Sequence, residues 1–160
     1  MLEKSKIIER LMLVDKECEF ENNRISIIII GRAIFILSYD IPKETHDIDI
    51  VANIKSNLFR KYGIDVVSPG ILNLSDDYVS RLVPVDNDFK ALTVFTLHAI
   101  DMILTKIGRG SPKDIEDCRY LMKNSNIDKI LLKNIFDDWK IDYIGSPDRL
   151  EATFNCIVGD

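Results

Sequence analysis

The sequence predicts a mixed α/β fold of the α+β kind, with a mixed sheet flanked by helices in its first part and a helical C-terminal part. Two observations predict this: short β-branched or alternating runs recur up to residue 98, and helical spacing of apolar residues replaces them from residue 99. No repeat and no polar linker divides the 160 residues. We therefore expect a single domain over 1–160, with a sheet-containing core at 1–98 and a helical part at 99–160.

The first elements alternate between helix and strand. Residues 3–21 carry apolar side chains at three- and four-residue spacing, which predicts an amphipathic helix. The run ISIIII at 25–30 is short, apolar and β-branched, which is typical of a buried strand, and it ends at Gly31. A short helix is expected at 32–39, followed by a turn at 40–44 that contains a proline.

The segment DIDIVAN at 47–53 alternates strictly between polar and apolar residues, which predicts a second strand. Alternation places Asp47 and Asp49 on one face of that strand. The rest of this part is expected to hold a helix at 56–62, a strand within 64–72, an irregular segment at 74–85 and a strand at 92–98.

Four helices are expected after residue 98, because apolar residues recur there at helical spacing and turn signals separate them. Pro112 is placed at the start of one of them, where its missing N–H costs nothing. The expected helices lie at 99–108, 113–124, 126–140 and 146–158.

Charge and composition exclude several classes of protein. With 21 Lys and Arg against 26 Asp and Glu, the net charge is -5, which argues against a protein that binds nucleic acid through an overall positive charge. The 3 cysteines match no zinc or redox spacing, which favours reduced thiols and a cytoplasmic location. The most apolar segment, 25–39, is interrupted by Gly31 and Arg32, and a membrane span needs about 20 apolar residues. We expect no membrane partner.

The acid pair is the most informative candidate site. Two carboxylates on one face of a strand are close enough to share a hard divalent cation such as Mg²⁺ with the phosphates of a substrate. The buried strand at 25–30 ends at Gly31, where the start of a helix would offer backbone N–H groups to phosphate. The alternative is that Asp47 and Asp49 are solvated residues on the polar face of an edge strand.

A second cluster lies in KIGRGSPKDIED at 106–117. Lys106 precedes a glycine-containing turn and would reach triphosphate oxygens, while Asp114 at the start of the next helix would orient it. The alternative is that the helix macrodipole alone favours basic residues at a helix end and acidic residues at a helix start.

Together these motifs resemble the minimal nucleotidyltransferase fold of the polymerase-β-like superfamily, in which a buried strand, Gly and a short helix precede an Asp-x-Asp pair. Here IIIIGRA is followed by THDIDIVA. The stretch VFTLHAIDMILTKIGRGSPKDIEDCRYLM is similar to a segment of AbiEii-type nucleotidyltransferases of toxin–antitoxin systems. Short bacterial nucleotidyltransferase-fold proteins also share segments like YGIDVVSPGI, an arginine like Arg81 and a last helix like RLEATFNCIVG.

The resemblance, which runs from Ile25 to the end of the chain, implies an Mg²⁺-dependent transfer of a nucleoside monophosphate from an NTP. The implied acceptor is an RNA end, such as that of tRNA, or a protein hydroxyl, and the implied protein partner is an antitoxin or a second copy of the chain. The implied metal ligands are Asp47 and Asp49. The implied catalytic residues are Asp47, Asp49, Lys106 and Asp114, and the implied nucleotide-binding residues are Gly31, Arg32, Thr45 and Arg109.

Two departures from the family pattern keep other functions open. Arg32 stands where the family has a small residue, and it would either contact phosphate or block the tight turn. The strand at 92–98 contains no third carboxylate. Asp65 precedes VVS, and Asp86 or Asp88 lies in a loop. The alternatives are a catalytically degenerate protein that binds a nucleotide or a protein, and a structural interaction protein whose charged clusters are surface features.

Overall fold

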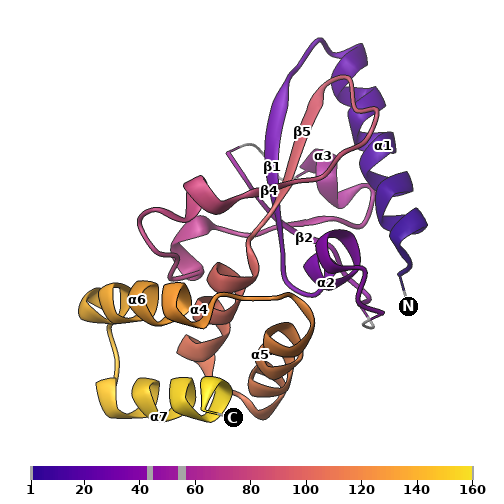
Figure 1. Ribbon diagram of the computed structural model, residues 1–160. Helices are drawn as coiled ribbons and strands as arrows, with labels where there is room; N and C mark the ends of the chain where they lie inside the picture. The colour runs from indigo at the N-terminus through magenta and orange to yellow at the C-terminus, as the bar shows by residue number, and fades with distance from the viewer. Residues whose placement is uncertain (1, 43–44, 54–56, 160) are drawn as a thin grey trace. The chain divides into compact units, whose positions relative to one another are not determined.

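Figure 1 shows the computed structural model of the chain, which describes residues 2–42, 45–53 and 57–159. The chain falls into two compact units. The first consists of residues 1–71 and 82–97, and the second of residues 72–81 and 98–160. The expected single-domain organisation stays a prediction.

The first unit is built on a five-stranded mixed sheet with the order β3-β2-β1-β5-β4. The central strand β1 (Ile25–Ile30) pairs in parallel with β5 (Leu92–Thr96) and antiparallel with β2 (Asp49–Ala52). At the edges, β3 (Asp65–Val66) runs parallel to β2, and β4 (Val83–Pro84) runs antiparallel to β5. This topology confirms the predicted mixed sheet.

The helices of the first unit are α1 (Lys4–Phe20), α2 (Ala33–Tyr39), α3 (Asn57–Arg60) and the 3₁₀ turn η1 (Pro69–Ile71). The first two confirm the predicted helices at 3–21 and 32–39. Residues 43–44 of the predicted turn and residue 56 of the predicted helix at 56–62 lie outside the described residues.

Two predictions about strands need correction. The strand predicted at 47–53 begins only at Asp49, so Asp47 lies ahead of it. The segment predicted as irregular contains β4, a two-residue edge strand that local sequence does not reveal. Pro84 belongs to β4, and a proline is tolerated there because an edge strand has a side without ladder hydrogen bonds.

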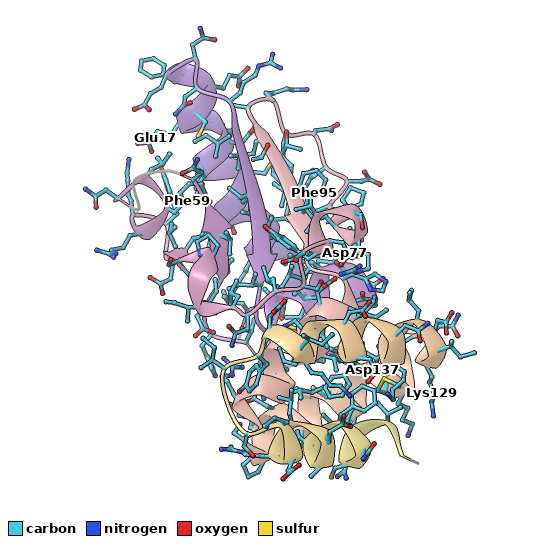
Figure 2. The ribbon with its side chains drawn as sticks, turned by 90° about the vertical axis from the view of Figure 1, so that its left-hand side faces the viewer. Glu17, Phe59, Asp77, Phe95, Lys129 and Asp137 are labelled. Atoms are coloured by element: carbon cyan, nitrogen blue, oxygen red, sulfur yellow. The ribbon has the colours of Figure 1, made fainter. Side chains whose placement is uncertain are left out.

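The core of the first unit lies between the sheet and α1. Phe59 of α3 is fully buried in this core (Figure 2). The other fully buried apolar side chains include Ile7, Leu11, Val14, Ile27, Ile29, Ile48, Ile50 and Ile64.

One buried acid ties α1 to the start of β5. The carboxylate of Asp15 accepts hydrogen bonds from the backbone N–H groups of Ala91 at 2.8 Å and Leu92 at 2.7 Å, and also from that of Lys90. Burial alone would raise the pKa of Asp15, but these backbone donors outweigh it and hold the pKa below its usual range. Asp15 therefore stays ionised while only 2% exposed.

We expect the Asp15→Asn variant to lose about 1–2 kcal/mol of unfolding free energy at neutral pH, because a neutral amide accepts these backbone donors more weakly. Urea denaturation at several pH values measures this. A carboxylate whose pKa is lowered by folding stabilises the protein at pH values above the ordinary aspartate pKa. The difference in unfolding free energy between the wild type and the variant should therefore shrink as the pH falls through the acidic range. A difference in unfolding free energy that does not change with pH would contradict the conclusion that Asp15 stabilises the fold as an ionised carboxylate.

The second unit is helical (Figure 1). It contains α4 (Ala99–Arg109), α5 (Pro112–Asn124), α6 (Lys129–Trp139) and α7 (Pro147–Val158), which confirm the four predicted helices. The helices α5, α6 and α7 begin after side-chain N-caps, supplied by Ser111, Asp128 and Ser146. The rings of Phe136 and Phe154 stack at 4.0 Å between α6 and α7. None of the helices in the described part of the chain combines the length and the apolar composition that a membrane span requires.

The segment 72–81, which ends in the 3₁₀ turn η2 (Tyr78–Arg81), is held to α4 by an arginine. Arg81 donates from Nε to Oδ2 of Asp101 at 3.0 Å and from Nη2 to Oδ1 at 2.8 Å. Its Nη1 also contacts Asp77, and its Nη2 contacts the hydroxyl of Ser75. Hydrogen bonding to Asp101, which is fully buried, raises the pKa of Arg81, so the ion pair between η2 and α4 stays charged.

Candidate functional site

The end of the central strand brings a glycine against a carboxylate. Ile30, the last residue of β1, has Asp49 as its partner across the antiparallel pair. Gly31 follows with a φ of +68°, in the left-handed region that favours glycine. A Cβ atom built on Gly31 would lie only 3.0 Å from Oδ2 of Asp49. The absence of a side chain at residue 31 therefore lets the backbone approach the carboxylate.

Asp47 is held in place just ahead of β2. Thr45 is buried, and its hydroxyl donates to the carbonyl oxygen of Asp47 at 3.0 Å and to Oδ1 of Asp47 at 3.3 Å. The carbonyl of Thr45 in turn accepts from the backbone N–H of Leu2 at 2.8 Å. Thr45 thus orients Asp47, and its expected contact with a nucleotide stays a prediction. Asp47 is exposed and Asp49 half-buried, so both carboxylates reach solvent.

A third acid lies on the neighbouring strand. Asp65 is the partner of Asp49 in the parallel register of β2 and β3. Residues paired in this way point to the same face of a sheet, and Asp65 is exposed. From the sequence alone, Asp65 is known only to precede VVS, because neither strand's own residues reveal which strand it pairs with. Within the described ranges, no three acidic, His or Cys side chains gather closely enough to hold a metal ion.

Arg32 follows Gly31 and occupies the N-cap position of α2, with helical backbone angles. The large side chain therefore does not prevent the turn: β1 ends, Gly31 adopts its left-handed conformation, and α2 begins within two residues. Of the two outcomes that the sequence left open for Arg32, blocking of the turn is excluded. Its contact with phosphate stays a prediction.

The second cluster is a buried ion group in the helical unit. The Nζ atom of Lys106 lies 3.1 Å from Oδ1 of Asp114 and 2.8 Å from Oδ2 of Asp117. The side chain of Lys106 is 4% exposed, that of Asp114 9% and that of Asp117 0%. The ammonium group of Lys106 thus bridges two carboxylates that are shielded from water. Its expected contact with a triphosphate stays a prediction.

Arg109 and Ser111 complete the contacts of Asp114. Arg109 donates from Nη2 to Oδ1 at 2.7 Å, and the hydroxyl of Ser111 donates to Oδ2 at 2.7 Å. Burial alone would raise the pKa of Asp114, but the hydrogen bonds from Arg109, Ser111 and Lys106 lower it to about 2. The side chain of Arg109 is 67% exposed, so it can meet an anion while it holds Asp114.

The local sequence explains how these groups meet. Gly110 caps α4 in a left-handed conformation with a φ of +61°, Ser111 is the N-cap of α5, and Pro112 is the first residue of that helix. This short connection places the last turn of α4 beside the first turn of α5. Lys106 and Asp114 are therefore neighbours although they are eight positions apart in the chain.

A family model described as a nucleotidyltransferase of unknown function (DUF6036) matches residues 9–156. The chain belongs to this family. No curated protein and no solved structure matches the chain. The match confirms the predicted resemblance to nucleotidyltransferases, while the AbiEii type stays a prediction.

The predicted site residues of this nucleotidyltransferase-family protein are divided between its two units. Within the first unit, the structure brings Gly31 against Asp49 and Thr45 against Asp47. Within the second, it brings Lys106 and Arg109 onto Asp114, with Asp117 as a further partner of the lysine. The catalytic and binding roles of these residues stay predictions.

Proposed function

We propose that the protein transfers a nucleoside monophosphate from an Mg²⁺-bound NTP to a hydroxyl group, on an RNA end or on a protein, as the toxin of a toxin–antitoxin pair. Its membership of a nucleotidyltransferase family supports the reaction class. The observation that carries the proposal is the approach of Gly31 to the carboxylate of Asp49, since a backbone without a side chain leaves space for phosphate beside an acid that can hold a metal ion.

The residues at the start of β2 fit a magnesium ion. Mg²⁺ prefers hard oxygen ligands, takes one or two carboxylates from the protein and keeps several waters. Asp47 and Asp49 would supply these carboxylates, and both reach solvent. Asp65 on β3 adds negative charge beside Asp49. When bound, the ion would neutralise charge on the triphosphate.

The proposed reaction is a substitution at the α-phosphorus of the NTP. The acceptor oxygen forms a bond to the α-phosphorus, and the bond from this phosphorus to the bridging oxygen of the β-phosphate breaks. Pyrophosphate leaves with the bonding electrons, and the proton of the acceptor hydroxyl passes to a carboxylate or to water. The protein's part is to position the two reactants and to stabilise negative charge.

A second candidate is a degenerate member of the family that binds a nucleotide or a protein without turnover. It is favoured by the enclosure of Lys106 between two carboxylates. The two candidates differ in pyrophosphate release. A degenerate member that binds a nucleotide also requires the acid pair for Mg²⁺-dependent binding, whereas one that binds only a protein does not.

Thermal unfolding with each of the four NTPs, with and without Mg²⁺, tests the site. A ligand at about 100 times its Kd adds roughly 2.7 kcal/mol to native stability, which raises the Tm of a chain of this length by about 5–10 °C. We expect a rise that requires Mg²⁺ and is lost in the Asp47→Asn/Asp49→Asn variant. The Asp86→Asn/Asp88→Asn variant, which makes the same charge change in an exposed loop, should keep it.

The outcome separates the candidates. A rise that persists in the Asp47→Asn/Asp49→Asn variant, or no rise with any NTP, contradicts a metal–nucleotide site at the acid pair. Where the rise is found, NTPs labelled at the α-phosphate test for transfer to RNA or protein. Stabilisation without pyrophosphate release would favour the degenerate candidate.

A further inference from the structure

The helical unit contains a pocket of about 350 Å³ that the proposed function does not use. Segment 72–81 forms one wall, and the end of α6 with the 3₁₀ turn η3 (Lys140–Asp142) and Tyr143 forms the other. All the residues that line it belong to this unit. A volume of this size suits a small organic molecule.

The lining of the pocket combines acids with aromatic rings. Asp76, Asp77, Asp138 and Asp142 line it, and among the described residues of its lining there is no Lys, Arg or His. The rings of Trp139 and Tyr143 lie beside these acids, with their centroids 5.3 Å apart. Aromatic faces attract cations and also cover the aliphatic parts of a ligand.

Hydrogen bonds hold the aromatic wall in place. The indole N–H of Trp139 donates to the carbonyl of Asn73 on the opposite wall at 2.7 Å. The hydroxyl of Tyr143 donates to the carbonyl of Gly108 on α4 at 2.9 Å. Because hydrogen bonds fix the polar ends of the two rings, their apolar parts are already positioned in the free protein. Binding of a ligand therefore costs little side-chain entropy at these two residues.

Nearby basic side chains leave much of the acidic charge unbalanced. Arg81 pairs with Asp101 and with Asp77, so Asp77 is partly neutralised. Lys140 lies next to the pocket in the chain but pairs with Asp137, labelled on α6 in Figure 2, and with Glu151. Within the part of the chain that the structure describes, no ion pair engages the three remaining acids, Asp76, Asp138 and Asp142. The pocket therefore presents a negative potential to solvent.

The acids come from both walls of the pocket, Asp76 and Asp77 from segment 72–81 and Asp138 and Asp142 from α6 and η3. In the described residues no three of them converge closely enough to hold one metal ion. Carboxylates on two walls of a pocket that is also lined by aromatic rings match an organic ligand whose positive charges are separated by aliphatic carbon. That is the chemistry of a diamine or triamine.

We propose that this pocket binds a small organic polyamine cation. Its ammonium groups meet Asp76, Asp138 and Asp142, and its methylene groups lie against Trp139 and Tyr143. The inference goes beyond the proposed function and does not depend on it, since the acid pair and the pocket belong to different units.

The chain contains one tryptophan, Trp139, so its fluorescence reports on this pocket directly. We expect spermidine to change the fluorescence of the full chain in a saturable way, and calorimetry of the same titration to give the same Kd. The Asp138→Asn/Asp142→Asn variant should bind at least about tenfold more weakly, because charged partners contribute more than neutral ones. The Asp88→Asn/Asp148→Asn variant removes the same charge at exposed positions outside the pocket and should bind like the wild type.

Several results would overturn the proposal. These are the absence of saturable binding by both methods, equal weakening in the two double variants, or an equal fluorescence response to Mg²⁺ alone at matched ionic strength. The Asp47→Asn/Asp49→Asn variant should bind spermidine as the wild type does. Spermidine binding is therefore measured independently of whether the protein transfers nucleotides.

Discussion

The Lys106→Met variant is expected to lose about 3–5 kcal/mol of unfolding free energy, because it leaves two buried carboxylates without their shared ammonium. Asp117 is fully buried and Asp114 nearly so, and their repulsion is now balanced by Lys106 at 2.8 and 3.1 Å. Methionine fills much of the volume of the lysine stem, so the loss reports on charge more than on a cavity. Urea denaturation followed by circular dichroism measures it.

Two further variants isolate the cause of this loss. Lys113→Met removes an exposed lysine from the start of α5 and should change the free energy by no more than about 0.5 kcal/mol. Adding Asp117→Asn to Lys106→Met should restore part of the loss, since only one buried carboxylate then remains charged. If Lys106→Met leaves stability unchanged while triphosphate binding falls more than monophosphate binding, Lys106 is a phosphate ligand and not a structural cation.

The sequence predicts most of the secondary structure, because strong periodicity is a local property. The strand predicted at 25–30 coincides with β1, and the helix predicted at 3–21 with α1 to within one residue at each end. The turn at Gly110 and Ser111 also has a local signature, and it is enough to bring Lys106 beside Asp114. The contacts between two helices that are consecutive in the chain can therefore be predicted from the sequence.

What the sequence does not reveal depends on pairing between distant segments. The short strand β4 exists through its register with β5, and Asp65 becomes the neighbour of Asp49 only through the pairing of β3 with β2. The polyamine pocket has the same origin, since Asn73 and Trp139 are 66 residues apart in the chain. Each of these segments reads as a polar loop or an ordinary helix when taken alone.

The Gly31→Ala variant is expected to lower nucleotide transfer by about tenfold, because the carboxylate of Asp49 must shift by a few tenths of an ångström and a misplacement of about 1 Å costs about 10²-fold. A Cβ atom at residue 31 would press on Oδ2 of Asp49 at 3.0 Å, and the neighbour must give way. The φ of +68° adds a backbone penalty of about 1–2 kcal/mol to the folded state. The Mg²⁺-dependent rise in Tm with NTP and the rate of pyrophosphate release are the two measurements.

Gly63→Ala is the matched control, because Gly63 has nearly the same backbone conformation, with a φ of +67°. There the added Cβ would meet Nη1 of Arg10 at 2.9 Å, the far end of a flexible side chain that can move aside. Both variants should therefore lose a similar amount of stability, and only Gly31→Ala should lose the response to Mg²⁺ and NTP. Equal nucleotide responses in the two variants would mean that the approach of Gly31 to Asp49 is a feature of the turn alone, and the phosphate site would have to lie elsewhere.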